Sequence, residues 1–139
     1  MRQEFFTLEI NTKGQNLYEF TDHTIKWINS LKLENGILNL SILHTSASLI
    51  LQENADPDVK KDLLNYFDRL VPMDEKSYIH NSEGKDDMPA HIKSALTNNQ
   101  ISLSIKKKEL LLGTWQGIYL FEHRIESQVR KIIHHFIGD

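Results

Sequence analysis

Hydrophobic and polar residues alternate along the first ten positions of the chain. Phe6, Leu8 and Ile10 fall on one face of a half-buried strand, and a second short strand is expected over 17–20. The same reasoning predicts later strands over 37–43, 49–53, 101–105, 110–112, 117–122 and 127–137. The strand over 117–122 is apolar at almost every position, which is typical of a strand buried on both faces.

Three segments have the spacing of amphipathic helices. The first begins at Thr21 or Asp22 and ends before the turn at 33–36, and the third begins near Pro89 and ends at Asn98 or Asn99. The second follows Asp56, a favourable N-cap with proline next to it, and has an expected buried face of Val59, Leu63, Tyr66, Phe67 and Leu70.

The strands and helices do not alternate regularly, as they would in a doubly wound sheet. The order predicts a single domain over 1–139 of the α+β class, with mainly antiparallel sheets packed against about three helices. Residues 71–88 are polar and show no regular period. A segment of this kind inside a compact domain is either a functional loop or a disordered insert.

Composition narrows the classes of function. The 139 residues include 16 basic and 19 acidic side chains, and this net charge of −3 argues against a nucleic-acid partner. There is no cysteine, which excludes disulfides, thiolate metal sites and cysteine nucleophiles. No apolar stretch approaches the ~20 residues of a membrane helix, and the first residues lack a signal-peptide core. We therefore expect a cytoplasmic protein without a membrane partner.

Three of the seven histidines lie at the ends of predicted elements, where loops gather into sites. These are His44, His91 and His123. Neutral imidazoles from separate elements suit zinc or a similar metal, and three protein ligands with an open position are typical of catalytic zinc. Spacing alone fits separate, hydrogen-bonded histidines equally well. Surface, capping or structural roles are expected for the other four, His23, His80, His134 and His135.

Acidic residues and a glycine loop add further candidates. Glu53 ends a strand, and Asp87 adjoins the polar loop, where it can orient a ligating histidine, hold a hard cation or stabilise a helix N-terminus. The backbone amides of the loop containing Gly113, Thr114 and Gly117, with Arg124 nearby, are candidate phosphate contacts. The competing interpretation is that these glycines serve a β-bulge around a packed tryptophan.

Three long motifs resemble one known family. HTSASLILQENADPDVKKDL (44–63), EGKDDMPAHIKSAL (83–96) and GTWQGIYLFEHR (113–124) together resemble the YjbQ-like secondary thiamine-phosphate synthase family. The resemblance implies an α+β subunit that assembles as a homotrimer. It also implies a metal site formed by the three histidines, and a weak thiamine-phosphate synthase activity. That reaction joins a pyrimidine diphosphate to a thiazole phosphate and releases pyrophosphate.

The resemblance gives the candidate residues provisional roles. A divalent cation, Arg124 and the loop amides would stabilise the leaving group, and Glu53 or Asp87 would handle a proton. A three-histidine site favours a zinc-like metal over magnesium, whereas diphosphate chemistry favours magnesium. Two alternatives therefore stay open: a metal-dependent hydrolase of a small phosphorylated or amide-like substrate, and a non-enzymatic trimer that binds metal or phosphate. We expect a small, phosphorylated partner molecule.

Overall fold

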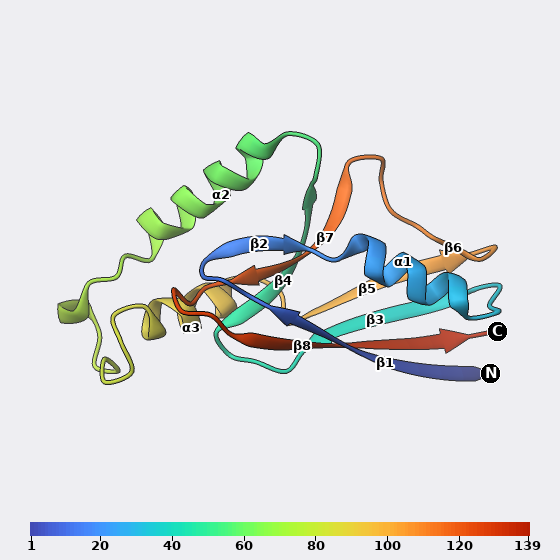
Figure 1. Ribbon diagram of the computed structural model, residues 1–139, viewed down its shortest axis with the longest axis horizontal. Coiled ribbons are helices and arrows are strands. Elements are labelled where there is room, and N and C mark those ends of the chain that lie inside the picture. The colour runs from blue at the N-terminus through green and yellow to red at the C-terminus, as the bar shows by residue number, and fades with distance from the viewer.

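The computed structural model describes residues 1–139 and arranges eight strands in two antiparallel sheets (Figure 1). The larger sheet has the order β1 (Arg2–Asn11), β8 (Val129–Gly138), β3 (Gly36–Ile42), β5 (Gln100–Lys106) and β6 (Glu109–Leu110). The smaller sheet has the order β2 (Asn16–Glu19), β7 (Gln116–Glu122) and β4 (Ala47–Glu53). The helices are α1 (Thr21–Ser30), α2 (Pro57–Leu70) and α3 (Asp87–Leu96), with a short 3-10 helix, η1 (Glu75–Ser77). The predicted α+β class is confirmed.

The main core lies between the inner face of the larger sheet, the smaller sheet and α1. It contains 16 buried residues. Leu40 and Phe136 come from the larger sheet, Leu49 and Leu120 from the smaller one, and Ile28 from α1. The alternation of apolar positions in the strands places these side chains on inner faces, where burial removes their apolar surface from water.

Strand β7 is buried on both faces, as its apolar sequence predicts. Ile118 and Leu120 point into the main core. Tyr119 and Phe121 point the other way, where they form a smaller cluster with side chains of α2, including Phe67. The rings of Phe67 and Phe121 meet edge to face, with centroids 5.3 Å apart. The end of β7 is thus fixed between two layers.

The start of α2 agrees with the sequence, but its buried face does not. The Asp56 side chain accepts a hydrogen bond from the Asp58 amide at 2.9 Å, as an N-cap does. Phe67 packs on the smaller sheet, whereas Tyr66 is 53% and Leu70 is 51% exposed. The helix covers only the small second cluster, so only part of its apolar stripe finds a partner.

Some element boundaries also differ from the predictions. Helix α1 has no side-chain cap, because the Thr21 hydroxyl instead donates to Glu19 and accepts from the Ile118 amide. Helix α3 begins at Asp87, two residues before Pro89. A proline is tolerated throughout the first turn, where its missing amide costs no helical hydrogen bond, so its position alone does not fix the start.

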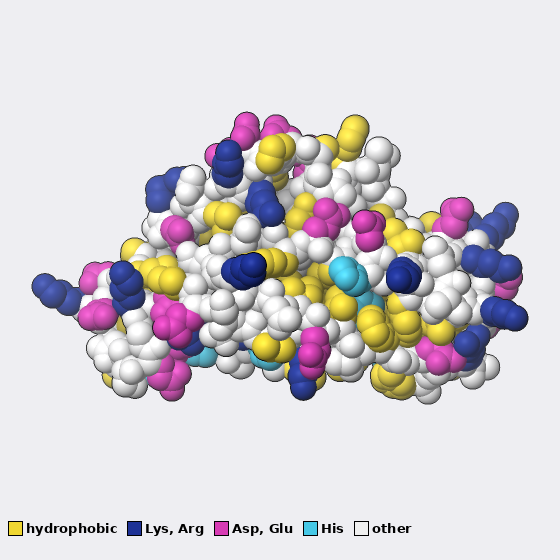
Figure 2. Space-filling model, in the orientation of Figure 1, with side chains coloured by type: hydrophobic (Ala, Val, Ile, Leu, Met, Phe, Trp, Pro, Cys, Tyr) yellow, Lys and Arg dark blue, Asp and Glu magenta, His cyan; other side chains and the backbone are white.

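The outer face of the larger sheet carries exposed apolar side chains. Phe5 is 65% exposed and stacks on His135 with ring centroids 4.1 Å apart. Ile37, which is 56% exposed, pairs with Ile137 in the adjacent strand. On the face shown in Figure 2, acidic and basic side chains are interspersed around apolar ones. None of the helices is long and apolar enough to cross a membrane.

Candidate metal centre

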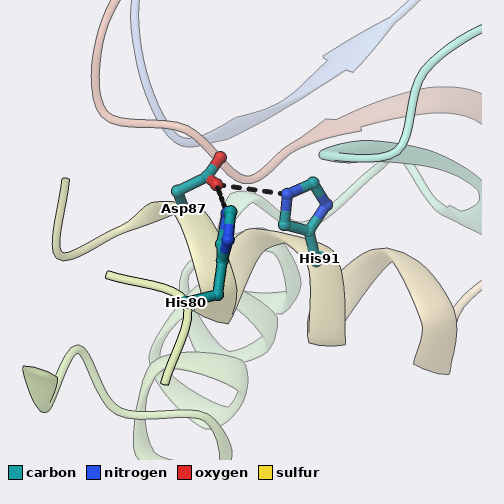
Figure 3. A group of neighbouring side chains, drawn as sticks. All are labelled: His80, Asp87 and His91. Atoms are coloured by element: carbon teal, nitrogen blue, oxygen red, sulfur yellow. Dashed lines mark hydrogen bonds and ion pairs between the residues drawn. The ribbon is translucent and has the colours of Figure 1, made fainter. Parts of the chain in front are cut away.

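Two histidines converge on one carboxylate at the start of α3 (Figure 3). The Nε2 atom of His80 lies 2.7 Å from Oδ2 of Asp87, and Nε2 of His91 lies 3.2 Å from the same oxygen. The potential ligand atoms of the three residues all lie within 4.8 Å of one another. Imidazole nitrogens and a carboxylate oxygen are the donor set of many zinc sites. These residues form the only such group in the chain.

The local sequence explains how this group forms. Asp87 and His91 are four residues apart on α3, so their side chains lie on the same face of the helix. Gly84 has a φ of +106°, a conformation that favours glycine, and its carbonyl accepts the Asp87 amide at 3.3 Å. This turn leads the polar loop into α3, and His80 reaches Asp87 from that loop.

The hydrogen bond of His91 to Thr45 fixes the protonation of one ring nitrogen. His91 Nδ1 lies 2.9 Å from the carbonyl oxygen of Thr45. A carbonyl oxygen only accepts, so Nδ1 carries the proton, and in the neutral ring Nε2 presents its lone pair. That lone pair faces the Asp87 carboxylate. Metal-ligating histidines usually donate their other ring N–H to a carbonyl or carboxylate in this way.

Arg124 holds the two aspartates at the start of α3. Its Nη1 donates to Asp87 Oδ1 at 2.6 Å, and its Nε donates to Asp86 Oδ2 at 2.9 Å. The Ile125 amide also donates to Asp86 Oδ2 at 2.9 Å. Arg124 was predicted to be a catalytic contact for a phosphate. Its guanidinium instead orients Asp87, leaving Oδ2 directed at the histidines.

These contacts keep both aspartates ionised. Burial works to raise the pKa of Asp87, but the hydrogen bond from His80 and the charges of His91 and Arg124 outweigh it, and the pKa lies below its usual value. Burial likewise opposes ionisation of Asp86, whereas the Ile125 amide and Arg124 lower its pKa. Asp87 therefore offers a charged ligand oxygen.

The spacing of the three donors fits a zinc-sized ion after a small movement. Metal–ligand bonds of about 2.1 Å in a tetrahedron place neighbouring ligand atoms about 3.4 Å apart. The Asp87–His91 distance of 3.2 Å is close to this value, and the Asp87–His80 distance of 2.7 Å is shorter. His80 lies in the loop with a side chain that is 44% exposed, so it can move outward. The donor set fits the zinc-like cation that the sequence predicts.

His44 presents a hydrogen-bond donor rather than a free lone pair. Its Nε2 accepts the backbone N–H of Lys131 at 2.8 Å, which places the ring proton on Nδ1. Burial and the charge of Arg130 lower the pKa of His44, so the ring is neutral at pH 7. His44 and His91 nevertheless line the same hollow. The structure thus brings these two histidines near one another in different roles.

His123 lies inside the protein, away from an open ligand position. The residue is 1% exposed, and its Nε2 lies 2.9 Å from the hydroxyl of Ser48. Burial lowers the pKa of His123 to about 3, and its Nδ1 is buried without a partner. The set of His44, His91 and His123 stays a prediction. In the single chain, however, His91 is grouped with His80 and Asp87.

The glycine loop and Glu53 lie at the other end of β7 from Arg124. Seven strand residues separate the two ends by roughly 20 Å. The Gly113 amide donates to the Gln116 side chain at 2.7 Å. A Cβ at Gly117 would meet a Glu19 carboxylate oxygen at 2.6 Å. An occupied amide and a nearby carboxylate both disfavour phosphate, so this loop and Thr114 gain no support as phosphate contacts. Glu53, paired with Gln116, lies at the same end of β7 as this loop.

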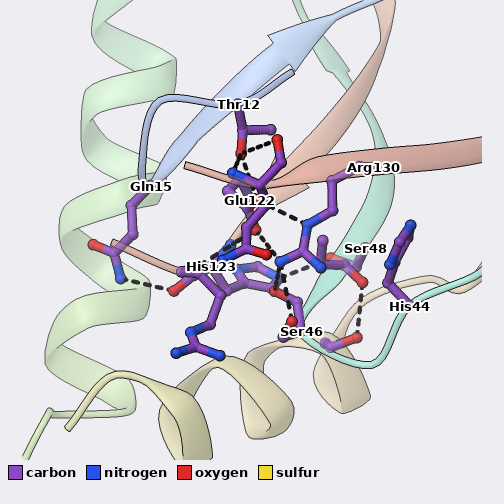
Figure 4. Close-up of polar contacts among 12 residues, drawn as sticks. Thr12, Gln15, His44, Ser46, Ser48, Glu122, His123 and Arg130 are labelled. Atoms are coloured by element: carbon purple, nitrogen blue, oxygen red, sulfur yellow. Dashed lines mark hydrogen bonds and ion pairs between the residues drawn. The ribbon is translucent and has the colours of Figure 1, made fainter. Parts of the chain in front are cut away.

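Glu122 belongs to a buried ion pair rather than to an open site (Figure 4). Arg130 donates from Nε and Nη2 to the two carboxylate oxygens of Glu122, at 2.8 and 2.6 Å. The Thr12 hydroxyl donates to the same carboxylate at 2.7 Å, and Arg130 also donates to the Ser46 hydroxyl at 3.0 Å. Glu122 and Arg130 are 0% and 4% exposed. This network ties β7 to β8 and to the end of β1.

Sequence reasoning missed His80. Asp87 and His91 were named as separate candidates, and the predicted helix start near Pro89 left Asp87 outside the helix that pairs them. His80 lies in a loop without a period. His80 was expected at the surface, and its side chain is 44% exposed, but its contact with Asp87 was not predicted. His80 and Asp87 are seven residues apart, and no known sequence motif with this spacing indicates such a contact.

Comparisons with known proteins identify relatives over nearly the whole chain. A family model described as UPF0047 protein YjbQ-like matches residues 6–139. A UPF0047 protein of Synechocystis is 45% identical over 138 residues, which cover 99% of this chain and 94% of the relative. The YjbQ protein of Salmonella typhimurium is 44% identical over 128 residues, covering 91% and 92% of the two chains.

Solved structures share the fold. A structure from Clostridium acetobutylicum, described as an uncharacterized conserved protein of the yjbq/upf0047 family, superposes with a TM-score of 0.82 and is 30% identical. It covers 96% of this chain and 99% of its own. A protein of unknown function from Sulfolobus solfataricus superposes with a TM-score of 0.86 at 19% identity, covering 99% and 100%.

These comparisons correct the predicted activity. The assignment as a thiamine-phosphate synthase is wrong, because the relatives carry UPF0047 names without that activity and the similar structures are described as uncharacterised or of unknown function. The geometry agrees with this correction. The reaction was expected to use Arg124 together with the Gly113–Gly117 amides on a diphosphate, but these groups lie at opposite ends of β7, and Arg124 and the Gly113 amide are already hydrogen-bonded.

Proposed function

The chain belongs to the YjbQ-like UPF0047 family, and we propose that its function depends on a divalent metal bound by His80, Asp87 and His91. The observation that carries this proposal is the approach of His91 Nε2 to the Asp87 carboxylate. The Nδ1–H of His91 is donated to Thr45, so Nε2 faces the carboxylate oxygen at 3.2 Å, as a donor when the ring is protonated and as a second acceptor when it is neutral. Two acceptors at this distance repel each other unless a proton or a cation lies near both.

The surrounding residues support metal binding in two ways. The Thr45 carbonyl fixes the His91 tautomer that ligation needs, and Arg124 holds the Asp87 oxygen that faces away from the histidines. When bound, a zinc-class cation supplies positive charge and an open coordination position that polarises a ligand oxygen. Two imidazoles and one carboxylate favour such a cation over magnesium, which prefers oxygen ligands.

Zinc titration with histidine variants tests this proposal. Zinc affinity is measured by competition with a chromophoric chelator in wild type, His80→Ala and His91→Ala. His135→Ala is the matched control, because His135 stacks on Phe5 on the outer face of the larger sheet. We expect each ligand variant to lose at least about tenfold in affinity while the control keeps it. Equal affinity in all four folded proteins would overturn the proposal.

We also propose that the chain forms a homotrimer, as the family resemblance implies. The outer face of the larger sheet supports self-association, because Phe5 and Ile37 are more than half exposed there. Light scattering coupled to size-exclusion chromatography measures the mass directly. We expect the wild type to have three times the chain mass of 16.2 kDa, and a double variant Phe5→Glu, Ile37→Glu to be smaller. A monomeric wild type would contradict the proposal.

The cytoplasmic location is a separate prediction from the sequence. Cell fractionation with an antibody against the untagged protein tests it. We expect the protein in the cytoplasmic fraction, and its recovery with the membrane fraction would contradict the prediction.

A further inference from the structure

A hollow of about 230 Å³ adjoins the proposed metal centre. It is lined by His44, Thr45, His91, Ser94, Ala95 and Asn99. The first two residues come from the loop between β3 and β4, the next three from α3, and the last from the segment before β5. His91 belongs both to this hollow and to the group around Asp87, so a molecule in the hollow lies beside the metal centre.

The hollow presents hydrogen-bond donors without a full positive charge. The Lys131 backbone N–H occupies Nε2 of His44, so Nδ1 carries the proton, and no side chain or carbonyl of the protein accepts it. The side-chain amide of Asn99 also makes no hydrogen bond within the chain, although its main-chain carbonyl accepts the Ile42 amide at 3.0 Å. Two residues that line the hollow, His44 and Asn99, therefore have N–H donors without a partner in the chain.

The charges nearby favour one class of ligand. No lysine or arginine lines the hollow, and the carboxylate of Asp87 lies beside His91 at its edge. A phosphoryl dianion generally requires Arg or Lys partners, whereas a carboxylate carries one charge and is well matched by neutral N–H donors. The Ser94 hydroxyl is already donated to the Ala47 carbonyl at 3.0 Å, which leaves only its acceptor face.

We propose that this hollow binds the carboxylate group of a small molecule, through His44 Nδ1–H and the Asn99 amide. Its use as the substrate subsite of the metal centre rests on the proposed function, but carboxylate binding itself does not. The role assigned to His44 also differs from the metal ligation that the family resemblance implies, since a ligating Nδ1 would need the proton on Nε2, opposite the Lys131 amide.

Nitrogen-detected NMR of protein with ¹⁵N-labelled histidine tests the proposal, with sodium acetate as the probe. The spectrum first identifies which ring nitrogen of His44 carries the proton, and acetate titration then follows its shift at constant ionic strength. Asn99→Asp places a like charge in the hollow without changing side-chain size. Asn98→Asp makes the same change one residue earlier, outside the hollow.

We expect a proton on His44 Nδ1 and a saturable acetate shift in wild type and Asn98→Asp. In Asn99→Asp the affinity should fall by roughly tenfold or more, because a carboxylate replaces a donor. Inorganic phosphate in a matched titration should bind more weakly than acetate. A proton on Nε2, no saturable acetate shift, equal effects of the two aspartate variants, or tighter binding of phosphate would each overturn the proposal.

Running the titration on chelator-treated and zinc-loaded protein separates this proposal from the metal site. Acetate binding without zinc binding would support the subsite and contradict the proposed function. Zinc binding without an effect of acetate on His44 would support the metal centre and overturn the subsite.

Discussion

The Nε2 atom of His91 lies 3.2 Å from Oδ2 of Asp87, while its Nδ1 is bonded to the Thr45 carbonyl. The backbone thus determines which nitrogen faces the carboxylate. The arrangement requires a cation or a proton between the two residues. For this reason we place Asp87 and His91, an i, i+4 pair on α3, at the centre of the proposed site.

Removing Arg124 should weaken metal binding without unfolding the chain. Its guanidinium holds Asp87 at Oδ1, so Arg124→Gln frees the carboxylate to rotate away from the histidines. Loss of an outer-shell contact of this kind typically reduces metal affinity about 10- to 100-fold. Zinc titration and circular dichroism measure the two effects. Arg69→Gln, at an exposed position on α2, is the control, and equal zinc affinity in both variants would refute the positioning role.

The pH dependence of stability should report the buried His134. Burial lowers the pKa of His134 to about 4, against an ordinary value of about 6.5. Below pH 6.5 the unfolded chain binds a proton that the native ring does not bind. Stability therefore falls as pH decreases, by about 1.4 kcal/mol per pH unit, until the native ring titrates near pH 4.

His134→Phe isolates this contribution. Phenylalanine keeps an aromatic ring beside Phe6 and Trp27, and it cannot bind a proton. Urea unfolding at pH 6.0 and 4.5 should show a smaller loss of stability in the variant than in wild type, although the variant loses the Thr24 hydrogen bond at both pH values. The same loss in both proteins would show that His134 is not held neutral.

Variants of Asp56, the N-cap of α2, should show whether its hydrogen bond or its charge stabilises the helix. Asp56 accepts the Asp58 amide, and asparagine can accept the same bond. Asp56→Asn should therefore change the free energy of unfolding little, whereas Asp56→Ala should cost about 1 kcal/mol. Urea denaturation measures both values. A large loss of metal binding in stably folded Asp56→Asn would reveal a role beyond capping.

The buried pair of Glu122 and Arg130 should be sensitive to removal of one partner. Glu122→Gln leaves the Arg130 guanidinium buried beside a neutral side chain, and breaking a buried pair typically costs about 3–5 kcal/mol. The double variant Glu122→Leu, Arg130→Met removes both charges and should recover part of that stability. A double variant less stable than the single one would contradict this account, as measured by thermal unfolding.

The sequence predicts the strands better than the uses of their end residues. Alternation along β1 and the apolar run of β7 are strong local signals, and both strands form as expected. The adjacent residues Glu122, His123 and Arg124 have three different sets of partners, because neighbouring positions at a strand end point in different directions.

The candidate site could be predicted only in part for a related reason. Asp87 and His91 were both candidates, but their pairing on one helix face depends on α3 beginning at Asp87, two residues before the predicted start, and the contact of His80 depends on the path of an irregular loop. The tautomers of His44 and His91 depend on backbone groups of Lys131 and Thr45, which are remote in sequence and leave no pattern there. The sequence identifies side chains that can bind a metal, whereas only the structure shows in which direction each histidine lone pair points.

Anomalous diffraction at the zinc edge, from crystals grown with zinc, tests the central claim most directly. We expect a peak within about 2.0–2.2 Å of His80 Nε2, Asp87 Oδ2 and His91 Nε2, and its absence in crystals of Asp87→Asn. A peak coordinated by His44 and His123, or no peak in wild-type crystals, would contradict the proposed metal centre.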